Sequence, residues 1–219
     1  LFRGFSIADL RFFGGFGFRK GLQYFLIVVN IGRNGCDRPI MVTGRPWLYD
    51  DLDKWIERMD GPPHKKALIF VDNLGFDLII GVLPFARELL IRGTKIILCS
   101  NREPVLNDVT HSELTKVMKQ VASISTVFNE ALTAGNLVLM EMSKSSCCVD
   151  LGFIDTQIAE ACKDVDLLVI DGMGRGVHTN LNASFNVDSL FLSVVKDTWF
   201  ASTLGGQWLS PICKYTPAM

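Results

Sequence analysis

The alternation of short apolar runs with segments of helical periodicity is the feature that most limits how this chain can fold. Residues 67–71 form one apolar run, residues 95–99 form another, and the sequence between them predicts a helix over residues 77–92. Gly93 suits the end of this helix, because glycine readily takes the left-handed conformation found there. A strand, a crossover helix and a second strand form a βαβ unit, so we expect two parallel, neighbouring strands.

The same alternation continues toward the C-terminus. Further helices are predicted within residues 48–59, 110–122 and 154–162. Further strands are predicted at residues 137–142, 166–170, 189–195 and 208–215. This succession predicts an α/β fold in which a doubly wound, mostly parallel sheet is flanked by helices.

The first part of the chain follows a different pattern. Residues 1–44 mix glycine with phenylalanine and show neither a clear helical period nor a strand period. We expect residues 1–44 to be a lead-in segment with a truncated or aberrant helical region, and residues 45–219 to form one α/β domain. Because the sequence starts with Leu1 rather than Met, we also expect it to be a fragment or a processed product.

The charge balance and the hydropathy argue against several classes of protein. The chain has 22 basic and 23 acidic residues and no basic stripe, so no nucleic-acid partner is expected. The only stretch that resembles a targeting signal, residues 22–31, is shorter than the roughly 20 residues of a membrane span. Six cysteines show no CxxC spacing, which favours reduced thiols. We therefore expect a cytoplasmic protein without a membrane partner.

Two acid-amide pairs follow the apolar runs. Asp72-Asn73 comes directly after the run at 67–71, and Asn107-Asp108 comes after the next run and its loop. Because the carboxyl ends of parallel strands meet at one edge of a sheet, we expect the two pairs to share that edge. Carboxylate and amide oxygens are ligands suited to Mg2+ or Mn2+. The alternative is that these residues only form turns and helix caps, which Asn107 or Asp108 could do ahead of the following helix.

A glycine-rich segment follows a later strand. Asp171, Gly172, Gly174 and Arg175 come after an apolar run, where glycine lets the backbone approach a ligand and arginine matches phosphate oxygens. Lys196 follows another apolar run and could meet a phosphate as a point charge. The alternative for the glycine-rich segment is a simple turn with a solvated Arg175. The alternative for Lys196 is a lysine at the protein surface.

Five segments in collinear order carry a specific resemblance to a known family. They are RPWLYDDLDKWIERMDGPPHKKALIFVDN, GVLPFARELLIRGTKIIL, LNDVTHSEL, GMGRGVHTN and LGGQWLSPICKY. Together they resemble the metal-dependent damage-control phosphatases, in the branch that includes the C-terminal domain of pantothenate kinase 4. The resemblance spans roughly residues 45–216.

The resemblance implies a phosphatase that uses Mn2+, Co2+, Ni2+ or Mg2+ to hydrolyse phosphate monoesters of small metabolites. For this branch the implied substrates are 4'-phosphopantetheine and its damaged forms, within coenzyme A metabolism. A homo-oligomer is a possible assembly. The implied metal ligands are Asp72, Asn73 and Asp108. The implied catalytic residues are Asp72, Asp108 and Asp171, and the expected phosphate-binding residues are Asn107, Arg175 and Lys196.

The chain departs from the family pattern at three places. Asp171 stands where the family signature has glutamate, Leu74 stands where a small residue is usual, and residues 1–40 do not match the family's helical lid. An alternative hypothesis is therefore a catalytically silent binding or scaffold domain that keeps the phosphatase fold. A nucleotide-binding oxidoreductase is disfavoured, because no complete GxGxxG follows a predicted strand.

Overall fold

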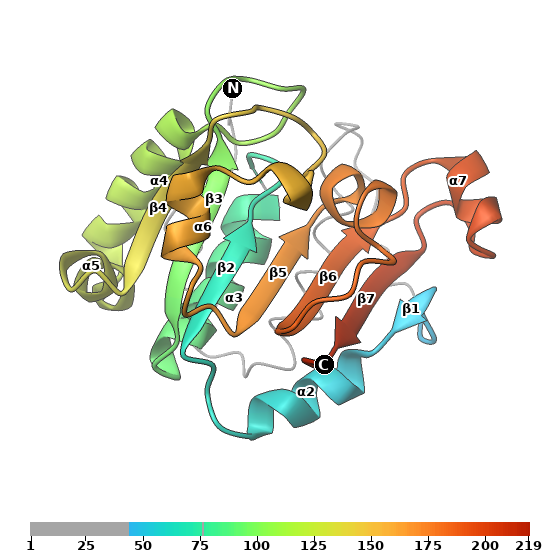
Figure 1. The fold of residues 1–219 in the computed structure, drawn as a ribbon, viewed down its shortest axis with the longest axis horizontal. Coiled ribbons are helices and arrows are strands. Elements are labelled where there is room, and N and C mark those ends of the chain that lie inside the picture. The colour runs from blue at the N-terminus through green and yellow to red at the C-terminus, as the bar shows by residue number, and fades with distance from the viewer. Residues whose placement is uncertain (1–43, 76) are drawn as a thin grey trace.

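One seven-stranded sheet organises the chain (Figure 1). The computed structural model describes residues 44–75 and 77–219. The strands are β1 (Tyr49–Asp50), β2 (Lys66–Phe70), β3 (Lys95–Asn101), β4 (Leu137–Met142), β5 (Leu167–Asp171), β6 (Asp188–Val194) and β7 (Pro211–Thr216). Their order across the sheet is β1-β7-β6-β5-β2-β3-β4.

The strands β2 to β6 form a parallel core, β1 pairs with β7 in parallel, and β6 pairs with β7 in antiparallel fashion. The sheet grows from β2 in one direction through β3 and β4, and β5 and β6 then add on the other side of β2. The order therefore reverses between β2 and β5. Ligands of open α/β sheets bind beside the carboxyl ends of strands at such a reversal.

Helices cover both faces of this sheet, and Figure 1 shows α6 in front of it and α3 behind it. The α-helices are α2 (Leu52–Asp60), α3 (Leu83–Ile91), α4 (His111–Ile124), α5 (Thr126–Thr133), α6 (Thr156–Ala161) and α7 (Thr198–Thr203). Wider π-helical turns form η2 (Asp77–Val82) and η4 (Met173–His178), and η3 (Leu151–Phe153) is a 3-10 turn. The predicted doubly wound α/β fold is confirmed.

Alternate residues of the strands enter two separate cores. Ile69 and Val169 pack on the face that α2, α3, α4 and α5 cover, whereas Phe70 and Ile170 pack on the face of α6. Both faces of the central strands are buried, which explains why these strands are apolar throughout rather than alternating. Within residues 44–75 and 77–219, no helix combines the length and the apolar character needed to cross a membrane.

Several predicted elements differ from the structure at their ends. The helix predicted within residues 48–59 begins only at Leu52, because Tyr49 and Asp50 pair with β7 as strand β1. The helix predicted over residues 77–92 is present, but its first part is the π-helical η2. The short helices α5 and α7 were not predicted. The predicted lead-in at residues 1–44 lies outside the described residues, apart from Gly44.

A buried ionic cluster lies at the amino end of β6. The carboxylate of Asp188 accepts hydrogen bonds from Arg58 Nε at 2.6 Å, from the Ala218 backbone N–H at 3.0 Å and from His64 Nε2 at 2.8 Å. Burial lowers the pKa of His64 below its ordinary 6.5 and outweighs the attraction of Asp188. Burial acts to raise the pKa of Asp188, but its three hydrogen bonds hold that pKa below its ordinary value.

This cluster predicts a loss of stability in mild acid. Because the pKa of His64 is lower in the folded chain than in the unfolded chain, the unfolded chain binds the proton first as the pH falls below 6.5. The contribution of His64 to the free energy of unfolding should then fall by about 1.4 kcal/mol per pH unit until its folded-state pKa is reached. The buried carboxyls of Asp72 and Asp77, whose pKa values are raised to about 7 and about 6, act in the opposite direction over the same range, so the effect of His64 is read as a difference between variants. The contribution of Asp188 is lost only at lower pH, since its folded pKa lies below 3.8.

Urea unfolding between pH 7.5 and 5 measures this dependence. His64→Gln keeps a donor for Asp188 but does not titrate, so the contribution of His64 to the slope below pH 6.5 should disappear, and the variant should lose less stability, or gain more, than the wild type as the pH falls. His111→Gln, which removes a histidine at the start of α4, should leave the slope in place. An unchanged slope in His64→Gln would contradict the assignment.

Candidate active site

Backbone hydrogen bonds bring the two acid-amide pairs together beyond the carboxyl ends of β2 and β3. The Val109 N–H donates to the carbonyl of Asp72 at 2.8 Å, and the Leu74 N–H donates to the carbonyl of Asn107 at 3.0 Å. Asn73 and Asp108 thus face each other in an isolated antiparallel bridge. The expected convergence of the two pairs at one edge of the sheet is observed.

Arg175, from the η4 turn after β5, connects the two carboxylates. Its Nε donates to Asp72 Oδ1 at 3.3 Å, and its Nη2 donates to Asp108 Oδ2 at 2.5 Å. The guanidinium is fully buried, and among the described residues its Nη1 has no hydrogen-bond partner. Arg175 is therefore not the solvated turn residue of the alternative interpretation.

Asn73 is held by acidic neighbours. Its Nδ2 donates to Asp72 Oδ2 at 2.8 Å and to Asp77 Oδ2 at 2.6 Å. These two bonds fix the amide so that Oδ1 is the atom able to bind a cation. Asp108 is held in a similar way, because Asn101 Nδ2 donates to its Oδ2 at 3.3 Å.

Two glycines allow the start of η4 to lie against its neighbours, one against the Asp72 carboxylate and one against the Cys147 backbone. Gly172 has a φ of 100°, and a Cβ at this position would lie 2.3 Å from Cγ of Asp72. A Cβ on Gly174 would lie 2.2 Å from the carbonyl oxygen of Cys147. No side chain fits in either place without a shift of its neighbours. The approach of this backbone to a ligand stays a prediction.

Four carboxyl groups gather around this point. Burial raises the pKa of Asp72 to about 7, with Arg175 opposing the rise and Asp108 adding to it. Burial also raises the pKa of Asp77 to about 6 and raises that of Asp108. The pKa of Asp171 is raised well above its ordinary value, first by burial and then by Asp72 and Asp77. The site holds more acidic groups than its cationic side chains can neutralise.

The remaining predicted site residues lie at different depths. Asp171 is fully buried, and Lys196 is half-buried and lowers the pKa of Asp72, Asp77 and Asp171 by its charge. The side chain of Asn107 is exposed, and its carbonyl is the group that contacts the site loop. The roles of all three in catalysis or phosphate binding stay predictions.

The donors present fit a divalent cation. Both oxygens of Asp171 and Oδ1 of Asp77 are buried without a partner in the described part of the chain, an arrangement that commonly marks a bound ion or water. Together with Asp72, Asn73 and Asp108 they offer hard oxygen ligands. Across residues 44–75 and 77–219, however, no three His, Cys, Asp or Glu side chains form a ready-made ligand cluster. Arg175 competes with a cation for the carboxylates of Asp72 and Asp108.

Sequence reasoning missed two polar residues of this site. Asp77 lies in the first turn of η2, where it was assigned only to the start of a helix. Asn101 ends β3 and is fully buried. A polar residue that ends an otherwise apolar strand at the ligand-binding edge was the available signal for Asn101.

The chain is similar to known proteins in both sequence and fold. Residues 42–208 match the damage-control phosphatase ARMT1-like domain. A 4'-phosphopantetheine phosphatase of Mus musculus is 39% identical over 220 residues, covering 78% of this chain and 27% of that protein. A pantothenate kinase 2 of Oryza sativa subsp. japonica is 39% identical over 199 residues, covering 79% of this chain and 22% of that protein. A damage-control phosphatase of Arabidopsis thaliana is 39% identical over 171 residues, covering 78% of this chain and 46% of that protein.

A solved structure has the same fold. The DUF89 family protein of Pyrococcus horikoshii superposes with a TM-score of 0.65 at 15% identity, covering 94% of this chain and 69% of that chain. The chain spans less than half the length of each of the three curated relatives.

Proposed function

Because the chain belongs to the ARMT1-like damage-control phosphatase family, we propose that it hydrolyses phosphate monoesters of small metabolites with the help of a divalent cation. The observation that carries this proposal is the meeting of Asp72, Asn73 and Asp108 around one buried arginine. These residues come from different strand ends, and they gather acidic oxygens where an α/β sheet binds its ligands.

Asp72, Asn73 and Asp108 would hold the cation. When bound, it would polarise the phosphoryl group and lower the pKa of an attacking water. The Nη1 of Arg175 is already buried and unbonded within the described residues, so it can donate to a phosphoryl oxygen without losing another bond. Lys196 would add a positive charge at the same edge, and Asp171 would orient the groups around the ester.

For the substrate we propose 4'-phosphopantetheine or its damaged forms, and for the cation Mn2+, Co2+, Ni2+ or Mg2+. The name of the Mus musculus relative supports the substrate. The oxygen donors support a hard or borderline divalent ion. The cytoplasmic location, the possible homo-oligomer, and the absence of membrane and nucleic-acid partners stay predictions.

A phosphate-release assay tests this function. We expect the purified full chain to release phosphate from 4'-phosphopantetheine and from phenyl phosphate when one of the four cations is added, and a chelator to stop both reactions. Release from neither substrate with any cation would favour the alternative of a catalytically silent scaffold domain.

Leu74 does not favour that alternative, because its side chain packs against the core on the face of α3 and α4.

A further inference from the structure

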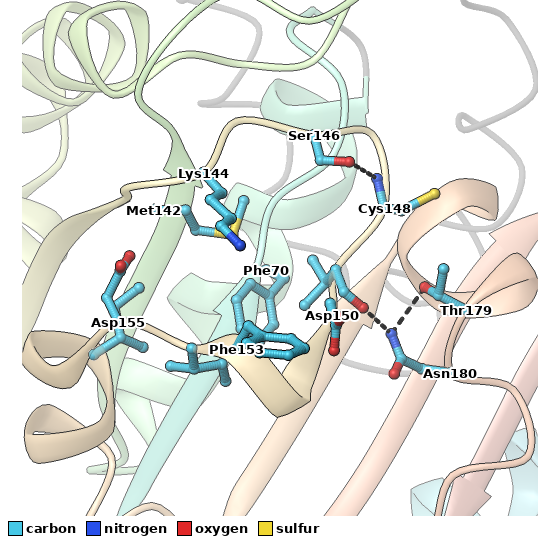
Figure 2. Close-up of a pocket in the computed structure, with 13 residues that line it drawn as sticks. Phe70, Met142, Lys144, Ser146, Cys148, Asp150, Phe153, Asp155, Thr179 and Asn180 are labelled. Carbon is cyan, nitrogen blue, oxygen red and sulfur yellow. Dashed lines mark hydrogen bonds between the residues drawn. The ribbon is translucent and has the colours of Figure 1, made fainter.

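A groove of about 610 Å³ opens beside the proposed active site (Figure 2). Its base is apolar and includes Phe70, Met142 and Val149, which are all buried. Its rim carries polar groups from the segment after β4 and from the end of η4. The volume falls within the range of about 300–1,000 Å³ that is usual for small-molecule sites.

The walls of this groove are bonded directly to the active site. Asn180 lines the groove, and its Nδ2 donates to the carbonyl of Arg175 at 2.7 Å. Ser146 also lines the groove, and its carbonyl accepts from Asn101, which also donates to Asp108. Phe70, the last residue of β2, also lines the groove, and it precedes Asp72 by two residues.

The rim offers hydrogen-bonding groups to a ligand. Asn180 uses its Nδ2 in bonds to Val149, Thr179 and Arg175, which leaves Oδ1 as its acceptor. Within the part of the chain that the structure describes, Asp150 accepts from the Gly152 N–H with Oδ1 only. On the other side the ammonium of Lys144 lies 5.2 Å from the ring centre of Phe153.

The charges select against a strongly anionic occupant. Two carboxylates, Asp150 and Asp155, line the groove with one ammonium, Lys144. A nucleotide would bring further negative charge beside the carboxylates. An uncharged chain with amide groups would instead pair its N–H with the acceptors, its carbonyl with Lys144, and its methyl groups with the apolar base.

The geometry points to this groove as the subsite for the organic arm of the phosphate ester, an elongated and uncharged chain that carries amides, as in pantetheine. The inference rests on the proposed function, because it concerns the same active site. Phe153 is 74% exposed at the rim and would be covered by the bound arm. Phe153 and Lys144 would therefore determine which substrate binds, and they would take no direct part in the hydrolysis.

The test compares a substrate that has an arm with one that lacks it. In Phe153→Ala, the ratio of kcat/KM for 4'-phosphopantetheine to kcat/KM for phenyl phosphate should fall about tenfold, because the alanine cannot cover the arm. Lys144→Met should lower the same ratio about threefold. Both side chains are exposed, so the variants should fold, which circular dichroism would verify.

Trp199→Ala is the matched control. Trp199 is 73% exposed on α7 and does not line the groove, so its replacement should leave the ratio unchanged. An unchanged ratio in both groove variants, including the case of an equal loss with both substrates, would show that the groove does not bind the organic arm. It would leave the proposed phosphatase activity intact. Absence of phosphate release by the wild type from either substrate would overturn the proposed function instead.

A second readout needs no turnover. Pantetheine itself, which lacks the phosphate, should bind the wild type in an NMR titration and bind Phe153→Ala about tenfold more weakly. Equal binding to both proteins would count against the groove, whatever the hydrolysis assay shows.

Discussion

Asp72→Asn should abolish cation-dependent phosphate release while leaving the fold intact. The loss should be at least about a thousandfold in kcat/KM, because the variant removes an anionic ligand and one partner of Arg175. Two effects on stability oppose each other. A neutral amide removes the cost of ionising a buried carboxyl whose pKa is raised to about 7, but its amino group cannot accept the hydrogen bond that Arg175 Nε or Asn73 Nδ2 now donates to Asp72, so we expect only a small net change.

Two measurements separate these effects. In metal-free buffer the thermal midpoint of Asp72→Asn should lie within a few degrees of that of the wild type, since the relief of a costly buried charge offsets the loss of one accepted hydrogen bond. Added Mn2+ should raise the midpoint of the wild type only, because a ligand stabilises the form that binds it. Asp164→Asn, an exposed acid-to-amide change after α6, serves as the control and should respond to Mn2+ like the wild type. An Mn2+ shift of full size in Asp72→Asn would remove Asp72 from the ligand set.

Gly172→Ala should damage both the fold and the site. The residue has a φ of 100°, which an L side chain rarely adopts, and its new Cβ would lie 2.3 Å from Cγ of Asp72. We expect the free energy of unfolding to fall by about 3 kcal/mol from backbone strain and overpacking together. The Mn2+-induced shift should also be lost, because the new Cβ would push the Asp72 carboxylate out of its present position.

Gly93→Ala isolates the strain from the clash. Gly93 has a φ of 93°, and nothing lies within 4 Å of a Cβ built there. Its replacement should cost about 1 kcal/mol in urea unfolding and leave the Mn2+ shift intact. If Gly172→Ala behaved in the same way, the tight contact between Gly172 and Asp72 would not be what holds the carboxylate in place.

The parallel core of the sheet was predictable because strands that are buried on both faces are apolar along their whole length, and such runs are visible in the local sequence. The apolar runs at residues 67–71 and 95–99 became the neighbours β2 and β3, as the βαβ pattern requires. The placement of Asp72 and Asp108 followed from the same rule, since parallel strands end at one edge. Gly93 takes the left-handed conformation at the end of α3, as expected from its position.

Short or marginal elements show no such run or period in the sequence. The helix α5 has only eight residues and directly follows α4, so its apolar positions are too few to define a period. The strand β1 has two residues, and its pairing with β7 depends on a partner more than 160 residues away in the sequence. Contacts of this kind carry no local signal.

The sequence by itself determined that an α/β sheet would form and that oxygen-bearing side chains would stand at the carboxyl ends of its strands, because strand burial and strand direction are written in local residue patterns. Only the tertiary structure decided that β5 lies beside β2, which places Arg175 between Asp72 and Asp108 and brings Asn180 to the wall of the groove. That neighbourhood depends on which strand adds to which edge of the sheet. Strand order results from packing the whole chain and not from the period of any one segment.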